Sequence, residues 1–272
     1  GRAPMRLLGC MIVRDESDAI ELVVRHNLAL LDGIAVIDHG SVDGTREILG
    51  AIVDEGLPVS VSDDPWPALE QKARINAVAR HAFATTDVDW LFPLDADEFL
   101  VPRRAPDLDG ALAHLGDARN VSLPWHMFGH SGHDTAPAGG IVPNYLMRAA
   151  DPMSDLRGVR AFKCVVDPCH VTEVGVHAFA TDGRWRTAND RGEEVDLARR
   201  VERGFYSAGH LQLNHYYARS RAELEAKVGR GPNLASKAPE YRRKVLRTVA
   251  NIEREQVEDR AALEYLARIA QM

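Results

Sequence analysis

Short apolar runs and helix-forming segments alternate along the first third of the chain. Four apolar runs bounded by polar or turn residues predict buried strands: "RLLGCMIV" (6–13), "GIAVID" (33–38), "LPVSVSD" (57–63) and "VDWLFPL" (88–94). Three segments between them predict helices: 15–31, 46–56 and 67–84. This order, with its short connections, predicts an α/β fold with a mostly parallel central sheet flanked by helices.

The second half of the chain has a different pattern. Further strands are predicted within four segments: 120–134, 158–168, 170–179 and 209–217. Residues 180–204 are polar and irregular, whereas the chain is helical from Arg219 onward, with 239–270 as one long helical segment. We therefore expect one domain over 5–231, with halves at about 5–100 and 101–231. A helical tail, 232–272, would pack back on this domain or on a second copy of the chain.

Polar clusters follow each of the first four predicted strands. They lie at residues 14–16, 38–43, 63–64 and 95–98. The carboxyl ends of parallel strands meet at one edge of a sheet, and ligands of open α/β sheets bind at that edge. The sequence therefore predicts that these four clusters lie together and form a binding site.

The last cluster carries the clearest chemistry. "WLFPLDADEFL" (90–100) runs from apolar residues into Asp95, Asp97 and Glu98 and then turns apolar again. Carboxylates this close repel one another, and burying them costs several kcal/mol each unless a cation lies among them. A turn beginning at Asp95 would let Asp95 and Asp97 reach one ion, and such oxygen ligands suit Mg²⁺ or Mn²⁺. An isolated D-x-D also occurs often by chance, as a turn cap beside a solvated acid.

Composition narrows the classes of function. The 272 residues are 45% hydrophobic and 27% charged, as in ordinary globular proteins. A net charge of −7 gives no support to nucleic-acid binding through a basic surface. The sequence has no apolar run of about 18 residues and no visible signal peptide. Three cysteines without a C-x-x-C pair fit a reducing compartment, so we expect a cytoplasmic protein, with peripheral membrane contact left open.

Several motifs together resemble a known enzyme family. "VIDHGSVDGT" (36–45) and "LFPLDADEF" (91–99), separated by a helix with "KARINAVA" (72–79), resemble the nucleotide-binding half of family 2-type glycosyltransferases with the GT-A fold. "DADEFL" together with "LNHYYARSRAELEAKVGRG" (213–231) is similar to the family 92-like branch. The resemblance covers roughly residues 6–231. It implies a Rossmann-like GT-A fold and an inverting hexosyltransferase that moves a sugar from a UDP-sugar to a glycan or other hydroxyl acceptor, as in polysaccharide biosynthesis.

The resemblance also implies a set of donor-binding residues. Asp38 matches the acid that contacts the nucleotide base, where a carboxylate can accept the uracil imide N–H. Other residues implied around the base or the phosphates are Arg14, Asp15, Glu16, Arg74, Asp95 and Lys163. Many relatives have a second Asp after the position of Asp38, and this chain has His39 there.

A metal site and a catalytic base are implied as well. Asp95 and Asp97 match the metal-binding D-x-D, with Asp97 the more direct ligand of an ion, Mn²⁺ or Mg²⁺, that bridges the diphosphate. A late histidine often completes this site; His215 is the best match and His177 the second. Inverting transfer needs a base for the acceptor hydroxyl. Three acids of the second half are candidates, and Asp155 is favoured because its irregular segment is expected near the acceptor: Asp134, Asp155 and Glu173.

Two alternatives remain at this stage. A D-x-D that follows apolar residues is also the first motif of haloacid-dehalogenase-type phosphatases. In those enzymes the motif lies near the N-terminus, whereas in this chain it follows four predicted strands. The chain could also be a non-catalytic nucleotide-sugar-binding module on the same fold.

Overall fold

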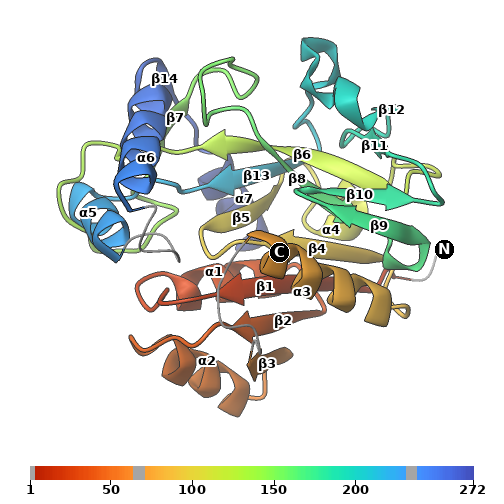
Figure 1. Ribbon diagram of the computed structural model, residues 1–272, viewed down its shortest axis with the longest axis horizontal. Coiled ribbons are helices and arrows are strands. Elements are labelled where there is room, and N and C mark those ends of the chain that lie inside the picture. The colour runs from red at the N-terminus through yellow and green to blue at the C-terminus, as the bar shows by residue number, and fades with distance from the viewer. Residues whose placement is uncertain (1–3, 64–70, 231–237) are drawn as a thin grey trace.

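The protein is described by a computed structural model that covers residues 4–63, 71–230 and 238–272; the side chains of residues 71–77 and 238 lie outside this description. Its centre is a ten-stranded sheet with the order β12-β11-β6-β8-β4-β1-β2-β3, which β13 and β5 join at the side. In Figure 1 the strands β1–β4 fill the lower half of the molecule, β6, β8 and β13 the upper half, and α5 and α6 stand at one end.

The first half forms the predicted parallel layer. Its elements are β1 (Leu7–Val13), α1 (Ile20–Leu28), β2 (Gly33–Asp38), α2 (Thr45–Asp54), β3 (Val59–Asp63), α3 (Gln71–Ala84) and β4 (Trp90–Leu94). β1 pairs in parallel with both β2 and β4, and β2 pairs in parallel with β3. Val13 lies beside Asp38 in this register, and Met11 lies beside Leu94. The carboxyl ends of β1, β2 and β4 therefore lie at the same edge of the sheet, within two residues of one another, as the sequence predicts.

Glycine at position 9 lets the chain pack closely in this layer. A Cβ added to Gly9 would lie 2.9 Å from Leu31 Cδ1, so a larger residue there would require the Leu31 side chain to shift. The apolar run of β1 is buried from Leu7 to Val13 except at Leu8 and Ile12, which are half-buried. Burial on both faces explains why this strand reads as a continuous apolar run.

The second half continues the sheet with antiparallel pairs. β8 (Phe162–Val166) pairs antiparallel with β4 and with β6 (Asn120–Met127), and β13 (Leu211–His215) runs parallel to β6 and antiparallel to β5 (Glu98–Pro102). In the last pair His215 lies beside Glu98. The remaining elements before the tail are α4 (Leu108–Ala111), β7 (Met147–Ala149), η1 (Pro168–His170), β9 (Val171–Gly175), β10 (Ala178–Thr181), β11 (Arg186–Ala188), β12 (Glu194–Asp196), η2 (Leu197–Val201), η3 (Arg203–Phe205) and α5 (Arg221–Arg230).

Two sequence predictions in this half were wrong. Residues 170–179 are not one strand but part of the antiparallel hairpin β9–β10. The turn lies at Val176–His177, where His177 has a φ of 50°, a left-handed conformation that a continuous strand excludes. Residues 180–204 are not irregular throughout, because they contain β11 and β12, whose three-residue length leaves no visible alternation.

The C-terminal tail is two helices, not the predicted single one. They are α6 (Ala238–Glu253) and α7 (Ala261–Ile269), separated by β14 (Gln256–Glu258), which pairs antiparallel with β7. The pairing of β14 with β7 interrupts the helical segment, and Asp259 accepts the N–H of Ala261 at 2.9 Å where α7 begins.

The tail packs back on its own domain. Apolar side chains of α6 face inward, with Val245 and Val249 buried in a cluster with residues of α5. Tyr265 of α7 is 2% exposed and belongs to the same apolar core as the first strands. Within the described ranges, none of the helices combines the length and the apolar character needed to cross a membrane.

Candidate active site

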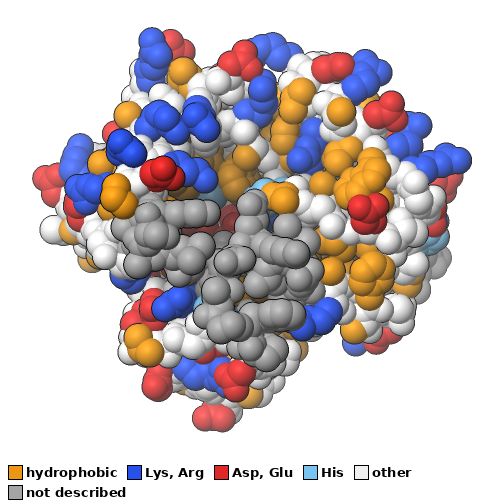
Figure 2. All heavy atoms as spheres, viewed as in Figure 1, with side chains coloured by type: hydrophobic (Ala, Val, Ile, Leu, Met, Phe, Trp, Pro, Cys, Tyr) orange, Lys and Arg blue, Asp and Glu red, His pale blue; other side chains and the backbone are white. Residues whose placement is uncertain are grey.

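The acidic segment is a tight turn between two buried strands. β4 ends at Leu94 and β5 begins at Glu98, whose N–H donates to the carbonyl of Asp95 at 3.1 Å. This is the turn that the sequence predicts at Asp95. It brings oxygen atoms of Asp95, Asp97 and Glu98 within 4.8 Å of one another, and among the described residues they are the only such group of His, Cys, Asp and Glu side chains. Figure 2 shows acidic and histidine side chains at the bottom of a hollow in this face of the molecule.

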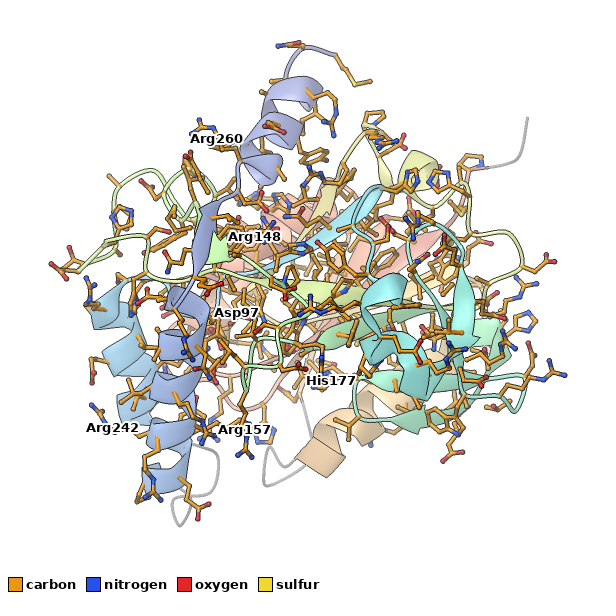
Figure 3. All side chains as sticks on the ribbon, turned by 90° about the horizontal axis from the view of Figure 1, so that it is seen from above. Asp97, Arg148, Arg157, His177, Arg242 and Arg260 are labelled. Carbon is orange, nitrogen blue, oxygen red and sulfur yellow. The ribbon has the colours of Figure 1, made fainter. Side chains whose placement is uncertain are left out.

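Two lysines and a histidine surround these carboxylates. Lys163 Nζ, from β8, lies 3.1 Å from Asp95 Oδ2 and 2.9 Å from Glu98 Oε1. Asp97 Oδ1 lies 3.0 Å from His215 Nε2 at the end of β13, and Asp97 Oδ2 lies 3.4 Å from Lys227 Nζ on α5. In Figure 3 Asp97 is near the middle of the molecule, with α5 and α6 on one side and His177 on the other.

Glu98 holds the turn in place. Its side chain is fully buried, and its carboxylate accepts the backbone N–H of Asp95 at 2.9 Å and the indole N–H of Trp125 at 3.2 Å, besides the Lys163 contact. Burial raises the pKa of Glu98, and the Lys163 ammonium opposes that rise. With three donors on its two oxygens, Glu98 is suited to orient Asp95 and Lys163.

Asp97 is held as a carboxylate. Burial alone would raise its pKa, but His215 and Lys227 outweigh this effect and keep the pKa below the ordinary range. His215 in turn has a buried Nδ1 with no hydrogen-bond partner among the described residues. The ligand atoms that lie together are the carboxylate oxygens of Asp95 and Asp97 and the Nε2 atom of His215, a set that fits a divalent cation.

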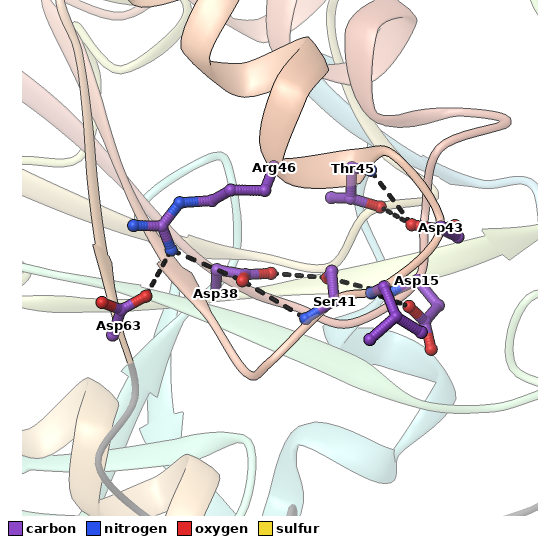
Figure 4. A network of polar contacts seen from close by, with 8 residues as sticks. Asp15, Asp38, Ser41, Asp43, Thr45, Arg46 and Asp63 are labelled. Carbon is purple, nitrogen blue, oxygen red and sulfur yellow. Dashed lines mark hydrogen bonds and ion pairs between the residues drawn. The ribbon is translucent and has the colours of Figure 1, made fainter.

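Asp38 lies at the end of β2, as predicted, and is buried. Its carboxylate accepts the Ser41 hydroxyl at 2.5 Å and lies 3.4 Å from Arg46 Nη1. Arg46 also bonds Asp63, at the end of β3 (Figure 4). The chain therefore fixes this carboxylate at the same edge of the sheet as the acidic turn.

The loop after β1 is joined to the loop after β2. Asp15 accepts the N–H of Val42 at 2.8 Å and donates its own N–H to the Ser41 hydroxyl at 3.0 Å (Figure 4). The N–H of Glu16 donates to the Thr45 hydroxyl at 2.8 Å. These bonds hold Asp15 at a φ of 52°. The two loops thus form one rigid wall beside Asp38.

The carboxyl group of Glu16 is close enough to Asp97 for the two charges to interact. Burial raises its pKa to about 7, and the charge of Asp97 adds to the rise, while Lys227 and Arg219 oppose it. Arg219 is 4% exposed and lies 3.1 Å from Asp18 and 3.4 Å from Glu223. Glu16 therefore links the predicted base pocket to the acidic turn.

The remaining predicted residues lie in different surroundings. Arg14 is partly exposed, 3.9 Å from Asp15, and the side chain of Arg74 lies outside the described residues. His177 is exposed in the β9–β10 turn, with its ring centroid 5.6 Å from that of Trp125. The Trp125 ring in turn lies edge to face with that of His215, with 4.4 Å between their centroids.

The three candidate bases are solvent-exposed. Asp134 pairs with Arg221 at 2.7 Å, and Asp155 pairs with Arg160 at 2.7 Å. Glu173 lies exposed on β9. Within the part of the chain that the structure describes, none of the three contacts the acidic turn, so their role stays a prediction.

Sequence reasoning did not assign a role to Lys227. The residue lies 130 positions after Asp97, in a helix whose charges would otherwise read as solvated. The available signal was its place in the "HYYARS…K" stretch that marks the family branch.

Fold and site together define a protein of the GT-A type, with a nucleotide-binding α/β half and an acidic turn after its fourth strand. The model of glycosyltransferase family 92 matches residues 34–196, well over half of the chain. The chain belongs to glycosyltransferase family 92. This confirms the predicted family branch and places the chain outside the haloacid-dehalogenase-type phosphatases.

Several solved structures are similar to this chain. A mannosyltransferase from Pyrobaculum calidifontis, in complex with GDP-Man and Mn²⁺, is 21% identical over 44% of this chain and 36% of its own, with a TM-score of 0.35. Glucosyl-3-phosphoglycerate synthase from Mycobacterium tuberculosis, with Mn²⁺, UDP and glucosyl-3-phosphoglycerate, is 18% identical over 44% of each chain, with a TM-score of 0.31. GalNAc-T7 with UDP, GalNAc and Mn²⁺ is 13% identical over 79% of this chain and 44% of its own, with a TM-score of 0.43. The matches thus span less than half of each of these proteins. No curated protein sequence matches the chain.

Proposed function

We propose that this protein is a metal-dependent, inverting glycosyltransferase that moves a hexose from a UDP-sugar to a hydroxyl group of a glycan or a smaller acceptor. The observation that carries the proposal is the placement of the acidic turn and His215 at the same sheet edge as Asp38. The acidic turn and His215 suit a dication, whereas Asp38 suits a nucleotide base.

Asp95, Asp97 and His215 would hold the cation. A donor set of two carboxylates and one imidazole suits Mn²⁺ better than Mg²⁺, which prefers oxygen ligands alone. When bound, the ion supplies a Lewis acid that neutralises the charge developing on the diphosphate leaving group.

The protein's own groups would orient the donor. Asp38, fixed by Ser41 and Arg46, has a carboxylate that can accept the imide N–H of uracil. The joined loops bearing Asp15 and Glu16 form the adjoining wall of the base pocket. Lys163 and Lys227 would add positive charge next to the diphosphate.

A carboxylate must accept the proton of the acceptor hydroxyl. We keep Asp155 as the proposed base, with Asp134 and Glu173 as alternatives. Support for Asp155 comes from its loop, which is fixed to α6: the Asn251 amide donates to the carbonyl of Arg157 at 2.9 Å. Glu16, with its pKa raised to about 7, is a fourth carboxyl to include in the test.

The nucleotide part of the proposal is tested by calorimetry with UDP. We expect UDP to bind at least about tenfold more tightly when Mn²⁺ is present. Asp38→Ala should weaken UDP binding even without metal, whereas Glu47→Ala, on the exposed face of α2, should leave it unchanged. An unchanged dissociation constant in Asp38→Ala would remove Asp38 from the base pocket. Turnover of UDP-glucose, UDP-galactose and UDP-N-acetylglucosamine then identifies the donor sugar.

A further inference from the structure

Two lysine ammonium groups already lie on the carboxylates that would bind the metal. Lys163 is 6% exposed and lies between Asp95 and Glu98. Lys227 lies on Asp97 and over the ring of Tyr217, with its Nζ 4.6 Å from the ring centroid. Any cation that these aspartates bind would therefore be only a few ångströms from two positive charges.

Repulsion between these charges and a dication would be strong. Charges in a partly buried site are screened far less than charges on an open surface. The carboxylates carry enough negative charge to balance either the lysines or a dication, but not enough to balance both. A nucleoside diphosphate brings the additional negative charge that would let them remain together.

We propose that Lys163 and Lys227 make metal binding depend on the nucleotide, so that the dication binds weakly alone and tightly together with the diphosphate. The inference rests on the proposed function, because it takes Asp95 and Asp97 as the metal ligands. By thermodynamic linkage, the factor by which UDP tightens Mn²⁺ binding equals the factor by which Mn²⁺ tightens UDP binding.

The contacts of each lysine allow this exchange. Lys163 keeps Glu98 as a partner if Asp95 turns to a metal ion, since Glu98 is fixed by Trp125 and by the N–H of Asp95. Asp97 has the bound cation as its partner if Lys227 moves to a phosphate, and the phosphate then becomes the partner of Lys227. Neither movement leaves a buried charge without a partner, so the cost that normally opposes breaking a buried ion pair is avoided.

The test measures Mn²⁺ affinity directly, by electron paramagnetic resonance of the free ion, with and without saturating UDP. Lys227→Met should bind Mn²⁺ alone about tenfold more tightly than the natural protein, and UDP should tighten this binding by a smaller factor. The single variant Lys163→Met should behave in the same way, because it removes the ammonium beside Asp95 while Glu98 keeps the Asp95 and Trp125 N–H donors. Lys244→Met, which removes an exposed lysine from α6, should leave Mn²⁺ binding unchanged.

The outcomes separate this inference from the proposed function. If both variants fold, as judged by circular dichroism, and bind Mn²⁺ alone no more tightly than the natural protein, the inference is overturned. If the natural protein binds UDP equally well with and without Mn²⁺, the proposed function itself fails.

Discussion

At the scale of single residues, the three carboxylates of the acidic turn differ in burial and in role. Glu98 is buried completely and used for hydrogen bonds, while the side chains of Asp95 and Asp97 are 39% and 16% exposed. The sequence predicted Asp95, Asp97 and His215 as neighbours because a strand-turn motif and a family pattern both mark them. The distances of Lys227 and Glu16 from Asp97 could not be predicted, since they depend on how distant elements pack.

Kinetic measurements can identify the residue that accepts the proton of the acceptor hydroxyl. Asp155→Asn should lower the rate of sugar transfer by about 100-fold or more while UDP and Mn²⁺ still bind normally, because a base acts on the acceptor and not on the donor. Asp134→Asn and Glu173→Gln are the matched comparisons, and both should stay active. A fully active Asp155→Asn together with an inactive Glu16→Gln would move the role to Glu16.

At the scale of elements, burial decided which segments the sequence could predict. The strands β1, β2 and β4 are buried on both faces, so they appear as continuous apolar runs. The sequence did not predict β5, because this strand starts with the buried Glu98. It did not predict β11 and β12 either, because three residues are too few to show a pattern. The hairpin β9–β10 and the break before α7 depend on tertiary contacts, which local propensity does not encode.

The break between α6 and α7 gives a stability prediction. Asp259 accepts Arg148 Nε at 2.6 Å and the Gln212 amide at 2.9 Å, and both partners of the ion pair are largely buried. Asp259→Ala should lower the free energy of unfolding by roughly 3–5 kcal/mol, because it leaves a buried guanidinium unpaired. The neighbouring change Glu258→Ala breaks only the exposed pair with Arg260 and should cost at most about 1 kcal/mol. Urea unfolding measures both; equal losses would show that the Arg148–Asp259 pair does not secure the tail.

At the scale of the whole molecule, the candidate site is assembled from both halves of the chain. The acidic turn belongs to the first half, whereas Lys163, His215 and Lys227 come from β8, β13 and α5 of the second. The pairing of β4 with β8 brings these halves together, and α7 packs against β5 behind the turn. A net charge of −7 is therefore compatible with a site in which lysines and a histidine balance the local acids.

The central claim is that the acidic turn binds a dication and, through it, the diphosphate of a nucleotide. The most direct measurement is the dissociation constant of UDP, with and without Mn²⁺, for Asp97→Ala and for the control Asp117→Ala, which removes an exposed carboxylate from a loop. We predict that Asp97→Ala abolishes the gain in UDP affinity that Mn²⁺ produces, while Asp117→Ala retains it in full. A folded Asp97→Ala variant that still gains affinity from Mn²⁺ as the natural protein does would contradict the account.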